Sequence, residues 1–397
     1  MKKITLSIIA IANIASAGGD FVDMANTTST YVTADNSSAE ISVLKAQMDA
    51  MQSKLTELEN RKVDTPAVEV KEPKHKGTMV KSHVPVLKFS GTHYLGFVNK
   101  KDHDDESTNK FETRRNYLQV KAYMKENPKD YMRITLDTHD DSNGESGVRL
   151  KYAYLYLDDV LPNTGLELGQ AHRPWIDYEE HNGWNYRSIS KTLVETKYGA
   201  DLTNSADRGV NLKTKTEYFS SELGIFNGEG YHNKESGDGL SKEWRLTGHL
   251  LGTGKQKAKK SATYANLSFF GQQNKLSHKH GDEDLNWMGL HAVYNQPEFL
   301  ASAQYIKVSD GIASKKGDGY SVNGEYRITP KINAIGRYDY FDMDDNTGER
   351  KRALAGLAYK YNHNVEFIAN YLKEGGSKLT NNNADNEAIM LTAAVEW

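Results

Sequence analysis

Beyond residue 86, apolar and polar side chains alternate in sixteen short runs, and the segments that connect these runs are alternately short and long. A period of two is typical of strands that bury one face. Short turns at one rim and long loops at the other are typical of outer-membrane barrels. We therefore predict an all-β, 16-stranded antiparallel transmembrane β-barrel over residues 86–397. The predicted strands are 86–98, 111–125, 130–139, 147–158, 165–172, 207–217, 219–227, 242–251, 261–271, 285–296, 298–309, 318–329, 331–342, 351–362, 364–374 and 386–397.

The composition favours the same class. Apolar residues make up 38% of the 397 residues and the mean hydropathy is −0.70, which excludes a bundle of membrane-spanning helices. The 23 tyrosines argue against a disordered chain, because disordered chains contain few aromatic residues. A net charge of −3 argues against a nucleic-acid partner held by bulk charge. The chain has no cysteine, which excludes disulfides and thiolate metal sites.

The N-terminus has the pattern of an export signal. Two lysines precede an apolar run, and Ala15-Ser16-Ala17 matches a small-residue cleavage site. We therefore predict a signal peptide at 1–17 and localisation in the outer membrane of a Gram-negative bacterium. Serine, threonine and asparagine dominate residues 18–40, which indicates a polar flexible leader.

A heptad pattern follows the leader. Its apolar seam comprises Ile41, Leu44, Met48, Met51, Leu55 and Leu58. This spacing predicts an α-helical coiled coil at 41–61; a lone amphipathic helix on another surface is the alternative. Prolines and lysines at 62–85 indicate an extended linker. An even number of strands puts both barrel termini on the turn side, so we expect the coiled coil in the periplasm.

Strand parity predicts which side chains face lipid and which face the lumen. In the last strand, Ile389, Leu391, Val395 and Trp397 share the expected lipid face. Three tyrosine pairs are expected in aromatic girdles at the membrane interfaces: Tyr154 and Tyr156, Tyr338 and Tyr340, Tyr359 and Tyr361.

The same parity rule places more basic than acidic side chains in the lumen. The basic set is Arg115, Lys121, Arg133, Arg149, Lys151, Lys213, Lys215, Arg245, Arg327, Arg337 and Lys360. The acidic set is Asp137, Glu167, Glu325, Asp339, Glu366 and Glu396. A wall of one sign raises the local concentration of counter-ions, which predicts a preference for anions. The alternative is a general diffusion pore in which the lumen charges are balanced.

Several short motifs resemble those of porins of the phosphate-selective O/P family. They are Phe111-Glu112-Thr113-Arg114-Arg115, Gly169-Gln170, Arg173-Pro174, Asp207-Arg208-Gly209-Val210 and Gly224-Ile225-Phe226-Asn227-Gly228. The terminal Trp397 is like the signal read by the barrel-assembly machinery. This resemblance implies a homotrimeric channel that passes small anions, with phosphate as one candidate, in contact with outer-membrane lipid.

The third long connection, residues 173–206, is the longest and carries charges of both signs, among them Arg173 and Arg187. In sixteen-stranded porins the third loop folds into the pore, and we expect the same here; a flap on the surface is the alternative. We predict a short helix at 192–198.

Nothing in the chain predicts catalysis. Hydrolase, zinc-protease, dinucleotide and P-loop signatures are missing from the sequence, and we expect neither a cofactor nor a metal site. The function predicted is passive diffusion of small hydrophilic solutes. The competing hypothesis is a structural or adhesive barrel that its coiled coil braces against the cell wall.

Overall fold

A computed structural model describes residues 86–101, 107–140, 146–233, 239–277, 283–312, 315–344, 348–376 and 386–397, together with Ala46, Asp49, Ala50 and Ser53. The chain divides into two units, Met1–Val80 and Lys81–Trp397. In the first unit the four described residues are helical, and the Ser53 hydroxyl donates to the Asp49 carbonyl at 2.9 Å. The predicted signal peptide, leader, linker and every seam residue of the coiled coil lie outside the described residues.

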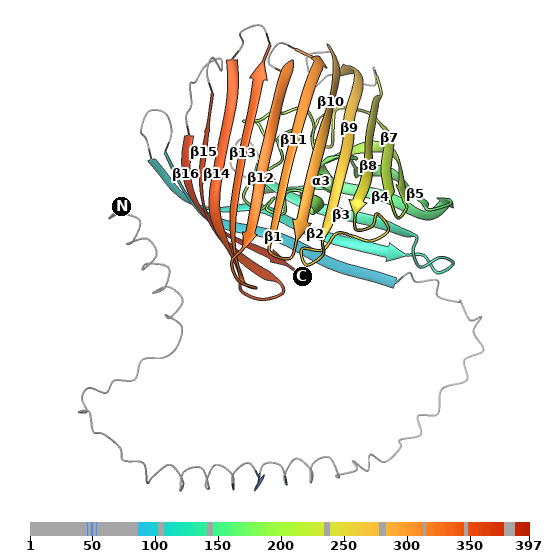
Figure 1. The fold of residues 1–397 in the computed structure, drawn as a ribbon. Helices are drawn as coiled ribbons and strands as arrows, with labels where there is room; N and C mark the ends of the chain where they lie inside the picture. Colours follow the sequence, from blue (N-terminus) through green and yellow to red (C-terminus); the bar gives the residue numbers. More distant parts are fainter. Residues whose placement is uncertain are drawn as a thin grey trace, which may run out of the picture. The chain divides into compact units, whose positions relative to one another are not determined.

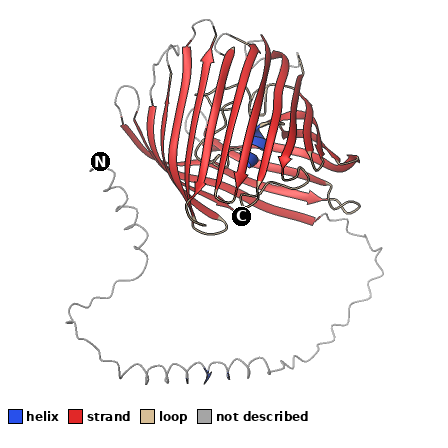
Figure 2. Ribbon diagram, in the orientation of Figure 1, coloured by secondary structure: helices blue, strands red, loops and turns tan. Residues whose placement is uncertain are grey.

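The second unit is a closed barrel, which confirms the predicted fold class (Figures 1 and 2). Each strand pairs with its sequence neighbours in antiparallel register, and β1 closes on β16. The strands are β1 Val86–Lys101, β2 Ser107–Tyr123, β3 Tyr131–Asp140, β4 Ser146–Leu161, β5 Thr164–His172, β6 Ala206–Lys215, β7 Phe219–Phe226, β8 Ser241–Leu251, β9 Tyr264–Ser277, β10 Glu283–Gln296, β11 Phe299–Asp310, β12 Gly317–Arg327, β13 Ile332–Met343, β14 Gly348–Lys360, β15 Val365–Gly375 and β16 Asn386–Glu396.

Several strands continue further towards the loops than predicted. The strand expected at 111–125 begins at Ser107, and the strand expected at 261–271 ends at Ser277. Their extra residues are mostly polar, so apolar alternation does not detect them. The ladder of backbone hydrogen bonds continues past the apolar band, because these bonds depend on the backbone and not on hydrophobic side chains.

Turn chemistry explains the tight rim. The Asn362 side-chain oxygen accepts from the amides of Asn364 and Val365, both at 2.8 Å, between β14 and β15. Asn163 adopts a positive φ of 59° between β4 and β5, a conformation that asparagine tolerates better than most residues. These residues reverse the chain within a few positions and so fix the register of the hairpins.

The barrel seam joins the two ends of the sheet at the turn rim. Gly91 and Trp397 exchange backbone hydrogen bonds of 2.8 and 3.1 Å, and the indole nitrogen donates to His93 Nε2 at 2.9 Å. A Cβ on Gly91 would lie 2.4 Å from the Trp397 ring, so the close approach requires glycine. The role of Trp397 as an assembly signal stays a prediction.

The loop between β5 and β6, residues 173–205, is called the third loop from here on. It contains a short helix, α3 Ile176–Asn182, inside the ring of strands (Figure 2). The helix predicted at 192–198 was wrong, since those residues form turns. The acidic residues Asp177 and Glu179 in the first turn of α3 are the better helix signal, because negative charge is favourable at a helix N-terminus. In the described chain, no helix has the length and apolarity to cross a membrane.

The third loop is held inside the barrel by apolar packing. Trp175 stacks on Phe270 of β9, with ring centroids 3.5 Å apart, and joins a buried cluster with Trp287 and Phe341. A second cluster packs Trp184, Tyr186 and Ile189 against β13–β16. The loop therefore covers the inner face of β9–β16, which contradicts the alternative of a surface flap.

Candidate channel lining

A cavity of about 990 Å³ remains inside the barrel, on the side that the third loop leaves uncovered. Its lining comes from the inward faces of β1–β5, the third loop, the turns at the turn rim and the turn-side ends of β12–β16. Nine basic side chains line the described part of this cavity: Arg115, Arg133, Lys151, Arg187, Lys257, Lys260, Arg327, Lys331 and Lys360. The five acidic ones are Asp177, Glu180, Glu298, Glu366 and Glu396.

The wall formed by β2, β3 and β4 presents cations beside tyrosine rings. Arg115 lies 4.7 Å from the ring centre of Tyr117, and Arg133 lies 4.5 Å from that of Tyr152. Lys151 lies 4.6 Å from the Tyr117 ring. Among the described residues, none of these three cations forms an ion pair with a carboxylate. Ring faces stabilise the guanidinium groups of Arg115 and Arg133 without cancelling their charge, so these two arginines give the wall a positive potential.

Lys121 belongs to the same wall, and its ammonium lies 4.3 Å from the Tyr131 ring centre. It does not line the cavity. Lys215 is exposed at the turn rim, at the end of β6. These two predicted positions therefore lie outside the lining of the cavity.

Two β-bulges build this wall. Opposite the bulge in the β1–β2 ladder, Tyr94 pairs with Arg115 and Leu95 with Thr113, so Arg114 is the extra residue. In the β3–β4 ladder, Thr135 pairs with Tyr152 and Leu136 with Leu150, so Lys151 is the extra residue.

Each bulge shifts strand parity by one. Tyr154, expected in a lipid-facing girdle, is therefore only 2% exposed and faces inward, where its hydroxyl accepts from Arg133 at 3.3 Å. Tyr156 follows the same parity and stacks on Tyr131. The girdle prediction for this pair was wrong.

Arg114 is a lumen residue that the parity rule missed. Its guanidinium donates to the Ser188 carbonyl at 3.2 Å and to the Thr392 hydroxyl at 2.9 Å, and it pairs with Glu112 at 2.7 Å. It thus ties the third loop to β16. The adjacent arginines at 114 and 115 are the only sequence signal that both face inward.

Other predicted lumen cations are neutralised by carboxylates. Arg149 pairs with Asp137 at 3.2 Å, and Lys213 contacts Glu167 at 3.3 Å. Neither lines the cavity. Arg327 does line it; it pairs with Glu325 at 2.9 Å and also donates to turn carbonyls, including that of Lys260 at 3.0 Å.

Arg245 and Arg337 face inward as predicted but are buried beneath the third loop. Arg245 lies 4.4 Å from the ring centre of Tyr178, and Arg337 lies 5.0 Å from that of Trp184. They do not line the cavity, which corrects the prediction: parity gives the direction of a side chain and not what covers it. Arg350 and Arg352 of β14 are also buried, and Arg352 donates to the Lys191 carbonyl at 3.1 Å.

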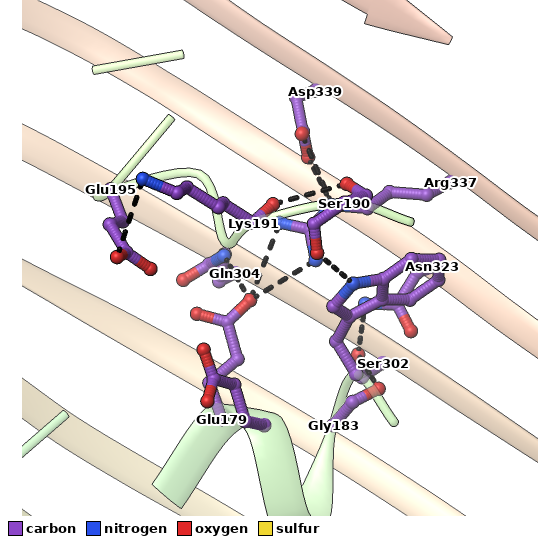
Figure 3. Close-up of polar contacts among 12 residues, drawn as sticks. Glu179, Gly183, Ser190, Lys191, Glu195, Ser302, Gln304, Asn323, Arg337 and Asp339 are labelled. Carbon is purple, nitrogen blue, oxygen red and sulfur yellow. Dashed lines mark hydrogen bonds and ion pairs between the residues drawn. The ribbon is translucent and has the colours of Figure 1, made fainter. Parts of the chain in front are cut away.

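Arg337 belongs to a polar latch between α3 and the covered wall (Figure 3). Glu179 accepts from Gln304 at 2.9 Å and contacts Arg337 at 3.4 Å, while Arg337 also binds Asp339 at 2.8 Å. Burial raises the pKa of the Glu179 carboxyl to about 7, although the guanidinium of Arg337 opposes this shift. The latch therefore adds a titratable contact to the apolar packing.

Arg173 anchors the base of the third loop and does not line the cavity, contrary to prediction. It is 2% exposed and binds Asp207 at 2.8 Å, Glu243 at 3.2 Å and the Gly228 carbonyl at 3.0 Å. The Gly228 amide also donates to Asp207 at 2.7 Å. Three of the motifs singled out in the sequence thus meet in one hydrogen-bonded cluster that positions the loop.

Metal binding finds no support in the described residues, where no group of three or more His, Asp or Glu side chains is arranged to hold an ion. The histidine-rich segment around residues 278–280 lies outside them.

Comparison with known proteins gives the fold. No family model and no curated relative match the chain. Solved structures do match. An anion-selective porin from Comamonas acidovorans superposes with a TM-score of 0.58 at 12% identity, covering 79% of this chain and 99% of its own.

Two further structures match to a similar extent. OmpF of Salmonella typhi in complex with daunomycin has a TM-score of 0.57 at 14% identity, covering 79% of this chain and 98% of its own. The trimer form of OmpT, an outer membrane protein of Vibrio cholerae, has a TM-score of 0.53 at 14% identity and covers 79% and 100%. The chain therefore has a porin-type barrel fold.

Proposed function

We propose that this protein is an outer-membrane porin that lets small hydrophilic solutes diffuse passively and prefers anions. The observation that carries the proposal is the cavity beside the third loop, where nine basic side chains face five acidic ones. A like-signed wall with low-dielectric surroundings concentrates counter-ions. The anion-selective porin among the structural neighbours supports the same preference.

The two tyrosine-backed arginines, Arg115 and Arg133, carry most of the expected selectivity. Their charge is not cancelled by a carboxylate within the described residues, unlike that of Arg149 or Lys213. Arginine binds oxyanions through paired N–H groups, so phosphate, which the family resemblance implies, is the candidate solute within this proposal.

A homotrimer is also part of the proposal, and the outer surface supports it. Exposed tyrosines of the described strands lie only on β10–β16: Tyr294, Tyr305, Tyr320, Tyr326, Tyr359 and Tyr371. On β3–β5 the exposed large apolar residues are aliphatic: Ile134, Leu136, Val148, Leu150, Val160, Leu161 and Leu168. Tyrosine belts mark contact with the membrane interface, and a face that lacks them fits a protein neighbour. The trimer form among the structural neighbours agrees with this assignment.

Planar bilayer recordings of the purified full-length protein test the proposal. We expect discrete conductance steps and, in a KCl gradient, a reversal potential with the sign of chloride permeation. Failure of a folded barrel to conduct would refute the porin function and favour a structural barrel. Current carried mainly by potassium would refute the anion preference alone.

A further inference from the structure

The tip of the third loop carries an ionic triad that faces the basic wall. Arg187 binds Glu195 through both terminal nitrogens, at 2.5 and 2.7 Å, and also pairs with Glu180. Glu180 and Arg187 line the cavity together with Arg115 and Lys151 of the opposite wall. Glu195 lies behind them and is buried, 6% exposed.

The triad has one positive and two negative charges, and the half-exposed ammonium of Lys191 adds a second cation 3.7 Å from Glu195. Burial by itself disfavours the ionised form of Glu195, but Arg187 and Lys191 together outweigh burial and hold the pKa of this carboxyl well below its ordinary value. At neutral pH the triad itself therefore carries a net charge of −1, with Lys191 beside it.

Arg187 thus differs from the cations on the wall. Arg115 and Arg133 rest on tyrosine rings and keep their charge available to a passing anion. The guanidinium of Arg187 already donates to both carboxylate oxygens of Glu195 and forms an ion pair with Glu180. Its positive charge acts mainly on Glu180 and Glu195.

We propose that Arg187 determines the charge selectivity of the channel by masking Glu180 and Glu195, and not by binding the permeating anion. This rests on the proposed porin function and assigns a specificity-determining role within it. The masking residue keeps two carboxylates from competing with solute for Arg115. Without Arg187, Glu180 would lose its ion pair, and Glu195 would keep only its 3.7 Å contact with Lys191.

A double substitution distinguishes masking from direct anion binding. In Arg187→Gln the triad has a charge of −2, and in Glu195→Gln its charge is 0. In the double variant Arg187→Gln/Glu195→Gln the charge returns to −1, as in the wild type. A masking role predicts that the double variant recovers wild-type selectivity, whereas an anion-binding Arg187 predicts that it remains as impaired as Arg187→Gln.

The measurement is the chloride-to-potassium permeability ratio, taken from the reversal potential of the full-length protein in planar bilayers. One unit charge about 7 Å from an ion in a water-filled pore changes the local ion concentration roughly two- to threefold. We expect the ratio to fall by about that factor in Arg187→Gln, to rise by about that factor in Glu195→Gln and to return to the wild-type value in the double variant.

Arg133→Gln is the matched control, because Arg133 lines the cavity without a carboxylate partner in the described chain. Its ratio should fall, because a wall cation without a carboxylate partner is lost. A double variant as impaired as Arg187→Gln would overturn the proposal.

Misfolding of Arg187→Gln would not remove the test. Glu195→Gln alone, an isosteric change, must raise the ratio, and an unchanged or lower ratio also overturns the proposal. A wild-type channel that prefers potassium would contradict the proposed anion preference, while the differences among the variants would still decide whether Arg187 masks the carboxylates.

Discussion

Two inserted residues, Arg114 in β2 and Lys151 in β4, decide which side chains reach the lumen. Each is the extra residue of a bulge and turns the residues beyond it to the other face. Parity read from the sequence placed Arg115 correctly, because its apolar reference positions Leu118 and Val120 lie on the same side of the bulge. It placed Lys151 correctly because the reference residues Val148 and Leu150 directly precede this extra residue. It misplaced Tyr154, which lies past a bulge, since a bulge has no sequence signature of its own.

Gly91 gives a test of the seam at this scale. Gly91→Val places new atoms in the space of the Trp397 indole, since even a Cβ would lie 2.4 Å from that ring. We expect a loss of about 1–3 kcal/mol in the free energy of unfolding and a smaller folded fraction. Heat-modifiable migration in electrophoresis measures that fraction.

Gly248→Val is the matched control, because a Cβ at Gly248 has its nearest neighbour, the Leu267 carbonyl oxygen, at 4.0 Å. Equal folded fractions for the two variants would show that the contact between Gly91 and Trp397 does not matter for barrel closure.

At the scale of elements, the third loop makes the interior of the barrel asymmetric. Its length and mixed charge indicated from the sequence that it is special. Its contacts could not be predicted, because Trp175 and Phe270, or Glu179 and Arg337, are far apart in the sequence and meet only through the closed sheet. The same limitation explains why Arg245 and Arg337 were expected in the lumen. Their partners belong to a loop whose path the alternating pattern does not describe.

The latch at Glu179 predicts a pH-dependent stability. Its pKa of about 7 in the folded protein lies above the ordinary value of 4.5, so the folded state binds the proton more tightly than the unfolded state. The stability that the proton confers is present below pH 4.5 and is lost as the pH rises towards 7. The unfolding free energy of Glu179→Gln relative to that of the wild type should therefore be higher at pH 8 than at pH 5, by up to about 3 kcal/mol.

Urea titrations of both proteins in detergent at pH 5 and pH 8 check this expectation. The quantity is the difference in unfolding free energy between variant and wild type at each pH. Identical differences at the two values would mean that Glu179 does not titrate in this range.

At the scale of the whole molecule, the barrel was predictable because its connections alternate between short and long along the entire chain. Sixteen strands follow from that regularity, and closure follows from the need to pair every strand edge in a membrane. The division of the outer surface into a tyrosine-bearing side and an aliphatic side was harder to predict, because it depends on exposure around the ring and not on any single strand.

Ile134→Trp tests the assignment of the aliphatic side to a trimer interface. Ile134 on β3 is 43% exposed and Val322 on β12 is 45% exposed. Fluid lipid accommodates a larger ring, whereas a packed protein interface loses about 1–3 kcal/mol. We expect Ile134→Trp to shift trimers towards monomers in native electrophoresis and Val322→Trp to leave them intact. Equal behaviour of the two variants would argue against an interface on β3.

Because the chain contains no cysteine, single introduced thiols can trace the ion path directly. Ser90 lines the cavity, whereas Ser321 is 1% exposed on the wall that the third loop covers, between Gln304 and Asp339 in register. A thiol-specific charged reagent should lower the single-channel current of Ser90→Cys in a discrete step and leave Ser321→Cys unchanged. If the reagent left the current of Ser90→Cys unchanged and lowered that of Ser321→Cys, the result would contradict an ion path along β1–β5 beside a docked third loop.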